Sequence, residues 1–281
     1  MNIHKNGLTE GFFFDLISSN QETDILTTHD RYFIRQKRGT MRILSIGNSF
    51  SQDATHYLHQ IARADGTYLD TVNLFIGGCS LQSHYLNILG DNPFYELQLN
   101  GSGSSILVSI RQALIQNVSS QWDAVTIQQA SHLSPHYETY RPYADLIVKE
   151  IRKYCPHTKI FIHQTWAYED DCARMKELGY SNAASMFTDI QKAYAELAQN
   201  VGADGIIPSG QVMQEALRLG IPKVHRDSFH ASLGLGRYLL GLTWYRFLTD
   251  RDISMNSFHE FDQPIPEREM ELAKEVVLNI V

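Results

Sequence analysis

Cysteine is scarce in this sequence, with three residues among 281. Cys79, Cys155 and Cys172 are too few and too far apart for a disulfide scaffold, and none belongs to the C-x-x-C spacing of zinc or redox sites. The cysteine content therefore indicates a protein of a reducing compartment.

The chain also lacks an excess of basic residues and any long apolar run. Its 24 Lys and Arg residues are outnumbered by 31 Asp and Glu residues, which excludes the positive charge that a phosphate backbone attracts. We therefore expect no nucleic-acid partner. No stretch reaches the roughly 18 consecutive apolar residues of a membrane span, so we expect no span and a soluble protein. A hydrophobic content of 43% is enough for the core of one large domain or two modest ones.

No signal peptide is recognisable at the N-terminus. The short apolar run 12–14 is interrupted at once by Asp15, and no small-residue cleavage site follows. We therefore expect the cytoplasm by default, with export as the alternative if the N-terminus is assigned wrongly. Residues 1–40 are polar and weakly periodic, so we treat them as an N-terminal extension of a main domain over residues 41–281.

Short apolar segments alternate with amphipathic ones along the main domain. The strands are predicted at residues 43–46, 72–76, 124–127, 159–162 and 205–207, and the helices at 54–64, 106–117, 143–154, 183–199, 210–219, 232–248 and 264–281. This alternation is typical of βαβ units, whose parallel sheet is buried on both faces. It predicts an α/β protein, a flavodoxin-like three-layer α/β/α sandwich with a central parallel sheet of about five strands.

Polar loops follow four of the predicted strands. They are residues 47–51, 77–80, 128–131 and 163–166, and a further polar loop covers 226–230. In open parallel sheets, ligands bind beyond the carboxyl ends of the strands. We therefore expect the chemistry of this protein in these loops.

Three side chains in these loops suit nucleophilic catalysis. Ser49 lies at the turn from the first strand into a helix, where the helix dipole stabilises developing negative charge, although a serine there is as often an N-cap. Asp227 and His230 are three residues apart, so the carboxylate can hold one imidazole nitrogen while the other faces a nucleophile. Alone, a D-x-x-H sequence usually marks a surface turn.

Together these loops resemble the SGNH (GDSL-like) hydrolase superfamily. Its first block, Gly-Asp-Ser-x-Ser, corresponds to residues 47–51, and its last block, Asp-x-x-His, corresponds to residues 227–230. Strings that are similar, more narrowly, to the DUF4886 family of Bacteroides-type bacteria are residues 46–51, 77–81, 128–131, 163–168 and 207–210. The resemblance covers about residues 41–250 and implies an SGNH hydrolase fold for the main domain.

The resemblance also implies roles for individual residues. Ser49 corresponds to the nucleophile, His230 to the general base and acid, and Asp227 to the carboxylate that orients the histidine. The oxyanion hole of the superfamily uses the backbone N–H of the serine, the backbone N–H of a second-block glycine and a third-block asparagine side chain. Gly78 matches that glycine, with Gly77 as the alternative.

Two positions depart from the superfamily pattern. Asn48 replaces the first-block aspartate, which removes a charge beside Ser49 but keeps a hydrogen-bonding side chain of the same shape. The third-block Gly-x-Asn is replaced by residues 128–131. Gln129 carries the same amide donor on a longer stem and is the candidate third donor, with Gln128 as the alternative.

Further residues in or near these loops are candidates for substrate contact. They are Asn48, His84, Gln128, His163 and Trp166. The twelve histidines show no ligand spacing such as H-E-x-x-H, so we expect no metal and no cofactor.

The resemblance favours a serine hydrolase that cleaves esters with a Ser-His-Asp triad. The expected substrate is a small-molecule or glycan ester, above all an acetylated carbohydrate. Two alternatives stay open: an SGNH scaffold with weakened turnover that binds glycans, suggested by the altered first and third blocks, and a metal-assisted phosphoesterase. The sequence makes no prediction about the oligomeric state.

Overall fold

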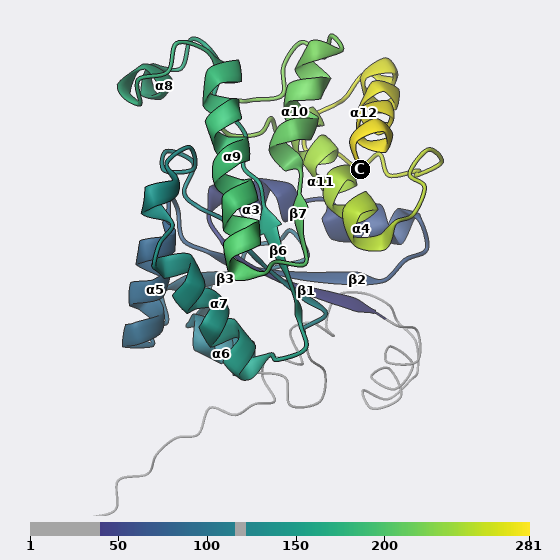
Figure 1. Cartoon of the computed structure of the whole chain (residues 1–281). Coiled ribbons are helices and arrows are strands. Elements are labelled where there is room, and N and C mark those ends of the chain that lie inside the picture. Colours follow the sequence, from purple (N-terminus) through teal and green to yellow (C-terminus); the bar gives the residue numbers. More distant parts are fainter. Residues whose placement is uncertain (1–39, 116–121) are drawn as a thin grey trace, which may run out of the picture. The chain divides into compact units, whose positions relative to one another are not determined.

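The computed structural model describes residues 40–115 and 122–281, so nearly all of the expected N-terminal extension lies outside the described residues. The described part is built on a seven-stranded sheet in the order β4-β3-β2-β1-β5-β6-β7 (Figure 1). The strands are β1 (Met41–Gly47), β2 (Leu69–Phe75), β3 (Tyr95–Leu99), β4 (Leu107–Val108), β5 (Ala124–Ile127), β6 (Lys159–His163) and β7 (Gly205–Ile207).

Five of the strands are parallel and correspond to the five predicted strands. β1 pairs with β2 on one side and β5 on the other, and β6 and β7 continue the sheet beyond β5. The side chains of Ile43, Leu44 and Ile46 in β1 are at most 1% exposed. Burial on both faces explains why these strands are continuous apolar runs in the sequence. The predicted α/β fold is confirmed.

The sheet is wider than predicted because two antiparallel strands extend it past β2. β3 pairs with β2, and β4 pairs with β3. The turn after β3 requires glycine at Gly101, where φ is +87° and a Cβ atom would lie 2.0 Å from the carbonyl oxygen of His56. The helix predicted from residue 106 begins only at Ile110, because β4 occupies Leu107–Val108. Its predicted end, residues 116–117, lies outside the described residues.

The helices form two groups. Their bounds are α3 (Ser49–Thr55), α4 (Leu58–Ala64), α5 (Leu81–Gly90), α6 (Ile110–Ile115), α7 (Tyr143–Tyr154), α8 (Ala173–Glu177), α9 (Ala183–Val201), α10 (Ser209–Arg218), α11 (Leu235–Thr249) and α12 (Glu267–Ile280), with a 3-10 turn η1 (Tyr137–Thr139). α3, α4, α10, α11 and α12 pack together, and α5, α6, α7 and α9 form the second group. The connection from β1 to β2 runs one way along the sheet, and the connections from β5 to β6 and β7 run the other way. Right-handed crossovers in these two directions place the two groups of helices on opposite faces.

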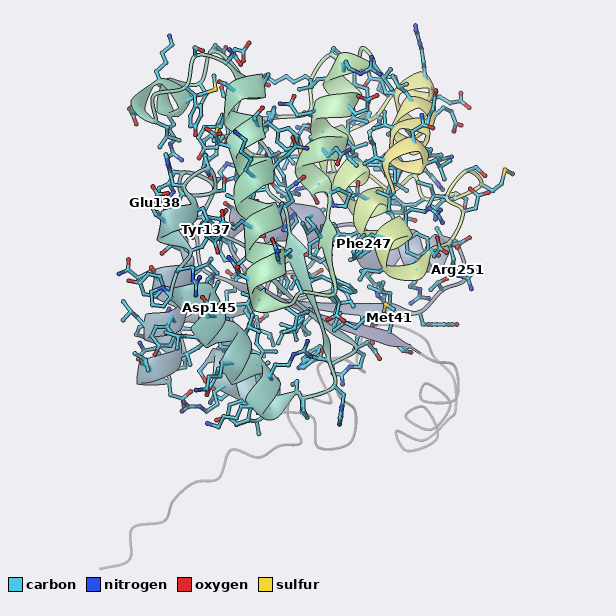
Figure 2. All side chains as sticks on the ribbon, in the orientation of Figure 1. Met41, Tyr137, Glu138, Asp145, Phe247 and Arg251 are labelled. Atoms are coloured by element: carbon cyan, nitrogen blue, oxygen red, sulfur yellow. The ribbon has the colours of Figure 1, made fainter. Side chains whose placement is uncertain are left out.

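Helix α11 anchors the first group to the sheet. Phe247 of α11 lies edge-on against Phe161 of β6, with ring centroids 5.0 Å apart (Figure 2). Trp244, one turn earlier, is fully buried. Because α11 also packs on α3 and α4, it fixes the helices that follow β1 over the sheet.

Three helical segments differ from the prediction. The segment predicted as one helix, residues 54–64, belongs to two helices, α3 and α4, which are separated at residues 56–57. The sequence pattern does not predict α5, because its apolar residues do not share a face: Leu86 and Leu89 are 54% and 63% exposed. Nor does it predict α8, a single short turn whose only buried side chain is Met175.

Candidate active site

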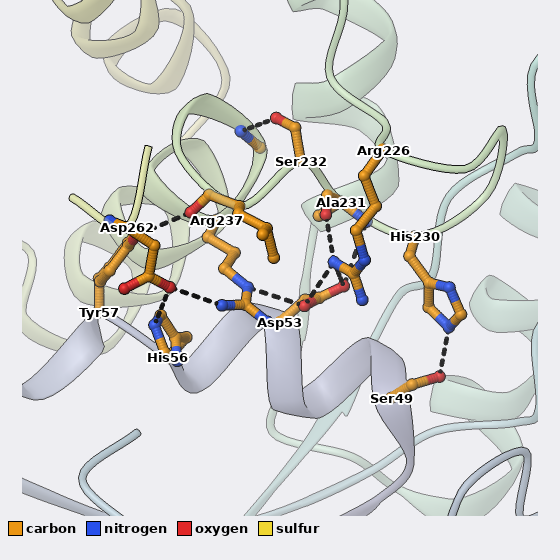
Figure 3. A network of polar contacts seen from close by, with 12 residues as sticks. Ser49, Asp53, His56, Tyr57, Arg226, His230, Ala231, Ser232, Arg237 and Asp262 are labelled. Carbon is orange, nitrogen blue, oxygen red and sulfur yellow. Dashed lines mark hydrogen bonds and ion pairs between the residues drawn. The ribbon is translucent and has the colours of Figure 1, made fainter. Parts of the chain in front are cut away.

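The structure brings Ser49, Asp227 and His230 together, although Ser49 lies about 180 residues before the other two in the chain. The Nε2 atom of His230 is 2.9 Å from the Ser49 hydroxyl oxygen (Figure 3). The Nδ1 atom is 2.7 Å from Oδ2 of Asp227. With Asp227 accepting from Nδ1–H, the lone pair of Nε2 faces the serine hydroxyl. This arrangement allows the imidazole to take the hydroxyl proton.

Ser49 is presented by a capped helix start directly after β1. Asn48 is the N-cap of α3, and its Oδ1 atom accepts a hydrogen bond of 3.0 Å from the backbone N–H of Phe50. The hydroxyl of Ser51 in turn accepts from the backbone N–H of Asn48. Gly47 is required here, since a Cβ atom would lie 2.2 Å from the Ser51 hydroxyl oxygen. Ser49 is thus the first helical residue, where backbone N–H groups have no intrahelical acceptor.

The Asp227–His230 loop folds back on itself. Ser228 adopts a left-handed conformation with φ of +70°, and the backbone N–H of His230 donates to Oδ1 of Asp227 over 2.8 Å. Partial burial alone would raise the pKa of Asp227, but the hydrogen bonds from His230 outweigh it and hold that pKa below its usual value. Asp227 is therefore ionised well into the acidic range and can stabilise a protonated His230.

A buried carboxylate that the sequence analysis does not single out connects the helix of Ser49 to the Asp227–His230 loop. Asp53, on α3 and fully buried, accepts hydrogen bonds from Nη1 of Arg226 at 3.0 and 2.9 Å and from Nε of Arg237 at 2.9 Å (Figure 3). It also accepts from the backbone N–H of Ala231 at 3.2 Å. Because Arg226 and Ala231 flank the Asp227–His230 loop, Asp53 connects this loop to α3, the helix of Ser49.

The same network continues away from the site. Nη1 of Arg237 is 2.9 Å from Asp262, which is also 2.8 Å from Nε2 of His56. Burial and the charge of Arg237 lower the pKa of His56, although Asp262 opposes them. In the sequence, this network appears only as charged residues next to apolar positions of the helices. Such charged residues alone would indicate a solvent-exposed face.

Gly78 lies in an exposed loop after β2, in a backbone conformation that favours glycine. Its φ is +64°, and a Cβ atom there would meet nothing within 4 Å. The loop is held next to the N-terminus of α3 by Asn48, whose Nδ2 atom donates to the carbonyl oxygen of Cys79 over 3.0 Å. Asn48 therefore links the N-terminus of α3 to the Gly77–Gly78 turn.

Gln129 does not lie as the sequence analysis predicts. Its Nε2 atom donates to both the carbonyl oxygen and the hydroxyl oxygen of Thr139, at 3.2 and 3.1 Å. Its Oε1 atom accepts from the backbone N–H groups of Leu81 and Ala130. Because both amide hydrogens are directed at Thr139 in a fully buried side chain, Gln129 presents no donor to the site.

The predicted substrate contacts Asn48, Gln128 and His163 lie beneath the site instead. All three side chains are at most 1% exposed. Gln128 donates from Nε2 to Oδ1 of Asn48 over 2.8 Å and accepts from Nδ1 of His163 over 2.5 Å. Burial lowers the pKa of His163 to about 3, so this histidine is neutral. The result is a directed chain of hydrogen bonds from the core to the N-cap of α3.

His84 and Trp166 are also buried, which corrects their assignment as substrate contacts. Nδ1 of His84 lies 2.8 Å from the hydroxyl of Tyr95, and burial lowers the pKa of His84 to about 3. Trp166 stacks on Phe50, with ring centroids 4.1 Å apart, and its indole N–H donates to the carbonyl oxygen of Phe229. Trp166 therefore supports the residue after Ser49 and the residue before His230.

Residues 40–115 and 122–281 contain no cluster of three or more His, Cys, Asp and Glu side chains arranged to hold a metal ion. No helix in the same ranges combines the length and apolarity that a bilayer crossing needs.

A mostly parallel α/β sheet, with a serine after its first strand and an Asp-x-x-His loop near its last helices, is the arrangement that the resemblance to the SGNH (GDSL-like) hydrolases implies. The chain belongs to the DUF4886 family, described as "Domain of unknown function (DUF4886)", whose family profile matches residues 42–279. The resemblance stated from the sequence is thereby confirmed. A search of curated proteins found no match.

A solved structure of the same family agrees with this assignment. A DUF4886 family protein from Bacteroides uniformis ATCC 8492 is 34% identical, with a TM-score of 0.78 over 85% of this chain and 94% of that chain. A candidate platelet activating factor from Streptococcus pneumonia is 14% identical, with a TM-score of 0.51 over 78% of this chain and 88% of that chain, a likeness that shows the fold alone. A member of the lipolytic protein G-D-S-L family from Veillonella parvula DSM 2008 is 16% identical, with a TM-score of 0.46 over 75% and 98% of the two chains.

Proposed function

We propose that this protein is a serine hydrolase that cleaves ester bonds, with acylated and above all acetylated carbohydrates as substrates. One observation carries the proposal: the unbroken hydrogen-bonded line from the Ser49 hydroxyl through His230 to Asp227, with distances of 2.9 and 2.7 Å. These three groups have no other evident reason to meet at the carboxyl end of β1. The carbohydrate part rests on analogy with the superfamily, whose members often deacetylate glycans.

In the first half of the reaction, the Ser49 oxygen attacks the ester carbonyl carbon as Nε2 of His230 takes the hydroxyl proton. Asp227 holds Nδ1–H and stabilises the imidazolium. The tetrahedral oxyanion is stabilised by the backbone N–H groups of Ser49 and Gly78. The C–O bond to the alcohol then breaks, the alcohol leaves with the proton of His230, and the acyl group remains on Ser49.

In the second half, water replaces the alcohol. Nε2 of His230 takes a proton from the water as its oxygen attacks the acyl carbon, and the second tetrahedral oxyanion occupies the same position. Ser49 leaves with the proton from His230, and the carboxylic acid is released. Each oxyanion-hole donor typically contributes about 2.7–4 kcal/mol, so a hole with two backbone donors supports turnover at a reduced rate.

The proposal is tested by labelling and by turnover. A fluorophosphonate probe should modify Ser49, as shown by peptide mass spectrometry, and Ser49→Ala should abolish both labelling and hydrolysis of 4-nitrophenyl acetate and of acetylated xylose. Ser185→Ala, in the first turn of α9, is the matched control and should leave both unchanged. Hydrolysis that survives in Ser49→Ala would contradict the proposed nucleophile.

A glycan-binding scaffold with weakened turnover is the second candidate. The observation that favours it is the commitment of both Gln129 amide hydrogens to Thr139, which removes the expected third oxyanion donor. Glycan binding by calorimetry, without labelling of Ser49 by the fluorophosphonate, would support this candidate over the esterase.

A further inference from the structure

Arg174, on the short helix α8, lies one aromatic ring away from His230. The guanidinium carbon of Arg174 is 4.4 Å from the centroid of the Phe229 ring. The Phe229 ring is in turn 4.1 Å from the imidazole ring of His230. Since Nε2 of His230 contacts the Ser49 hydroxyl, a permanent positive charge lies close to the proposed position of the ester.

Arg174 also lies near a tyrosine in the loop that follows β6. Burial raises the pKa of Tyr168 and the charge of Arg174 opposes that rise, and the Tyr168 hydroxyl lies 2.8 Å from the hydroxyl of Ser131 in the loop after β5. Tyr168 is fully buried and packs on Phe229, with ring centroids 5.5 Å apart. The guanidinium is thus placed by a buried tyrosine and by the aromatic ring beside His230, which limits the freedom of an otherwise long and exposed side chain.

The field of Arg174 also reaches the loop after β5. Burial lowers the pKa of His132, and the charge of Arg174 lowers it further. His132 directly follows Ser131 in the loop after β5. Arg174 therefore lies between the loop after β5 and the Asp227–His230 loop, the two segments that border the proposed site.

No described carboxylate neutralises the charge of Arg174. In the part of the chain that the structure describes, no carboxylate forms an ion pair with Arg174. Most arginines there are paired, namely Arg111, Arg141, Arg152, Arg218, Arg226, Arg237, Arg246 and Arg251. An exposed guanidinium that is positioned but lacks an acidic partner retains donors for the carboxylate of a ligand.

We propose that Arg174 is a specificity-determining residue that binds a carboxylate of the substrate, so that the enzyme prefers acidic esters over neutral ones. This inference rests on the proposed esterase function and names its substrate class. A carboxylate on the acyl group and a carboxylate on the alcohol, as in an acetylated uronic acid, share the same chemistry at Arg174. A purely structural contact between Arg174 and Phe229 would instead affect acidic and neutral esters alike.

Two matched substrate pairs distinguish these cases. Mono-4-nitrophenyl glutarate and 4-nitrophenyl valerate place or omit a carboxylate on the acyl side. Mono-O-acetyl glucuronic acid and mono-O-acetyl glucose do so on the alcohol side, with acetate release as the readout. The kcat/KM of each ester is measured for wild type, Arg174→Gln and Lys176→Gln. Lys176 is an exposed cation of the same helix, two residues on, so its substitution controls for a general loss of positive charge.

Arg174→Gln should lower kcat/KM for the acidic member of one pair by about 10- to 100-fold, the usual effect of a lost charge-assisted hydrogen bond, and leave both neutral esters within about twofold. The affected pair identifies the side that carries the carboxylate. Arg174→Lys should restore part of the preference, and Lys176→Gln should change none of the four values by more than about twofold.

Two results would overturn the inference, and they differ from each other. If Ser49-dependent hydrolysis occurs but Arg174→Gln changes acidic and neutral esters by the same factor, Arg174 is structural and the esterase function stands. If none of the four esters is hydrolysed in a Ser49-dependent way, the esterase function fails and the inference fails with it.

Discussion

Asp53 should control both stability and catalysis, because it is the buried anion between the helix of Ser49 and the loop of His230. Asp53→Asn keeps the size of the side chain but leaves the two guanidinium groups without their shared carboxylate. Removing one partner of a buried ion pair typically costs about 3–5 kcal/mol. The expected loss is at the lower end, about 3 kcal/mol, because Arg237 retains Asp262 at 2.9 Å and the Arg226 side chain is 27% exposed.

The catalytic effect follows from the same geometry. Without Asp53, the residues that flank the Asp227–His230 loop lose their anchor on α3, and a shift of about 1 Å in a reacting group can cost roughly 100-fold in rate. We expect kcat for 4-nitrophenyl acetate to fall about 10- to 100-fold with little change in KM. The rate of fluorophosphonate labelling at Ser49 should fall in parallel, since both depend on the position of His230.

The assay combines urea unfolding with kinetics at a temperature where the variant is fully folded. Arg226→Gln should reproduce the loss of kcat, because it breaks the same connection from the other side. Arg218→Gln is the control: its exposed pair with Glu215 at 2.6 Å lies on α10, and neither stability nor kcat should change measurably. A folded Asp53→Asn protein with wild-type kcat and labelling rate would refute the positioning role.

Two further predictions concern the other buried polar groups. Gln129→Leu should lower the free energy of unfolding by about 1–3 kcal/mol because the hydrogen bonds to Thr139 are lost, and the kcat of the folded enzyme should be nearly unchanged. Unchanged stability with a kcat about 100- to 1,000-fold lower would instead show that Gln129 is a donor of the oxyanion hole. Burial lowers the pKa of His84 and His163 to about 3 and of His225 to about 4, from an ordinary value of 6.5. Between these values and 6.5 the unfolded chain binds more protons than the folded one, so stability is complete above pH 6.5 and falls on acidification, by about 2 kcal/mol per histidine from pH 7 to 5. Urea unfolding at the two pH values checks this, and His163→Gln should reduce the difference; an identical difference in that variant would contradict the assignment.

The parallel strands and most of the long helices could be predicted because their apolar residues recur with a clear period. β3 and β4 could not, since Leu107–Val108 is a two-residue edge strand and its pairing with β3 is defined only by the neighbouring chain. The break at residues 56–57 between α3 and α4 was equally invisible, because apolar periodicity continues across it.

The candidate site divides in the same way. Ser49, Asp227 and His230 could be proposed because residues 47–51 and 227–230 resemble the first and last blocks of the SGNH (GDSL-like) hydrolases. The directions in which the surrounding polar side chains point could not be predicted from the sequence. Gln128, Gln129 and His163 occur in loops or strand ends where substrate contact is expected, but they point inward and are at most 1% exposed. No local periodicity distinguishes these orientations at the end of a strand.

By itself, therefore, the sequence determined the α/β class and the family, because both depend on apolar periods and short motifs, and it supplied the three candidate residues of the proposed triad. Only the tertiary structure decided that Asp53 joins Arg226 and Arg237 across about 180 residues, that Gln129 supports a loop, and that Arg174 lies beside Phe229 with no acidic partner among the described residues. Hydrogen bonds and charges act over a few ångströms of space, and the fold alone determines which distant residues come that close.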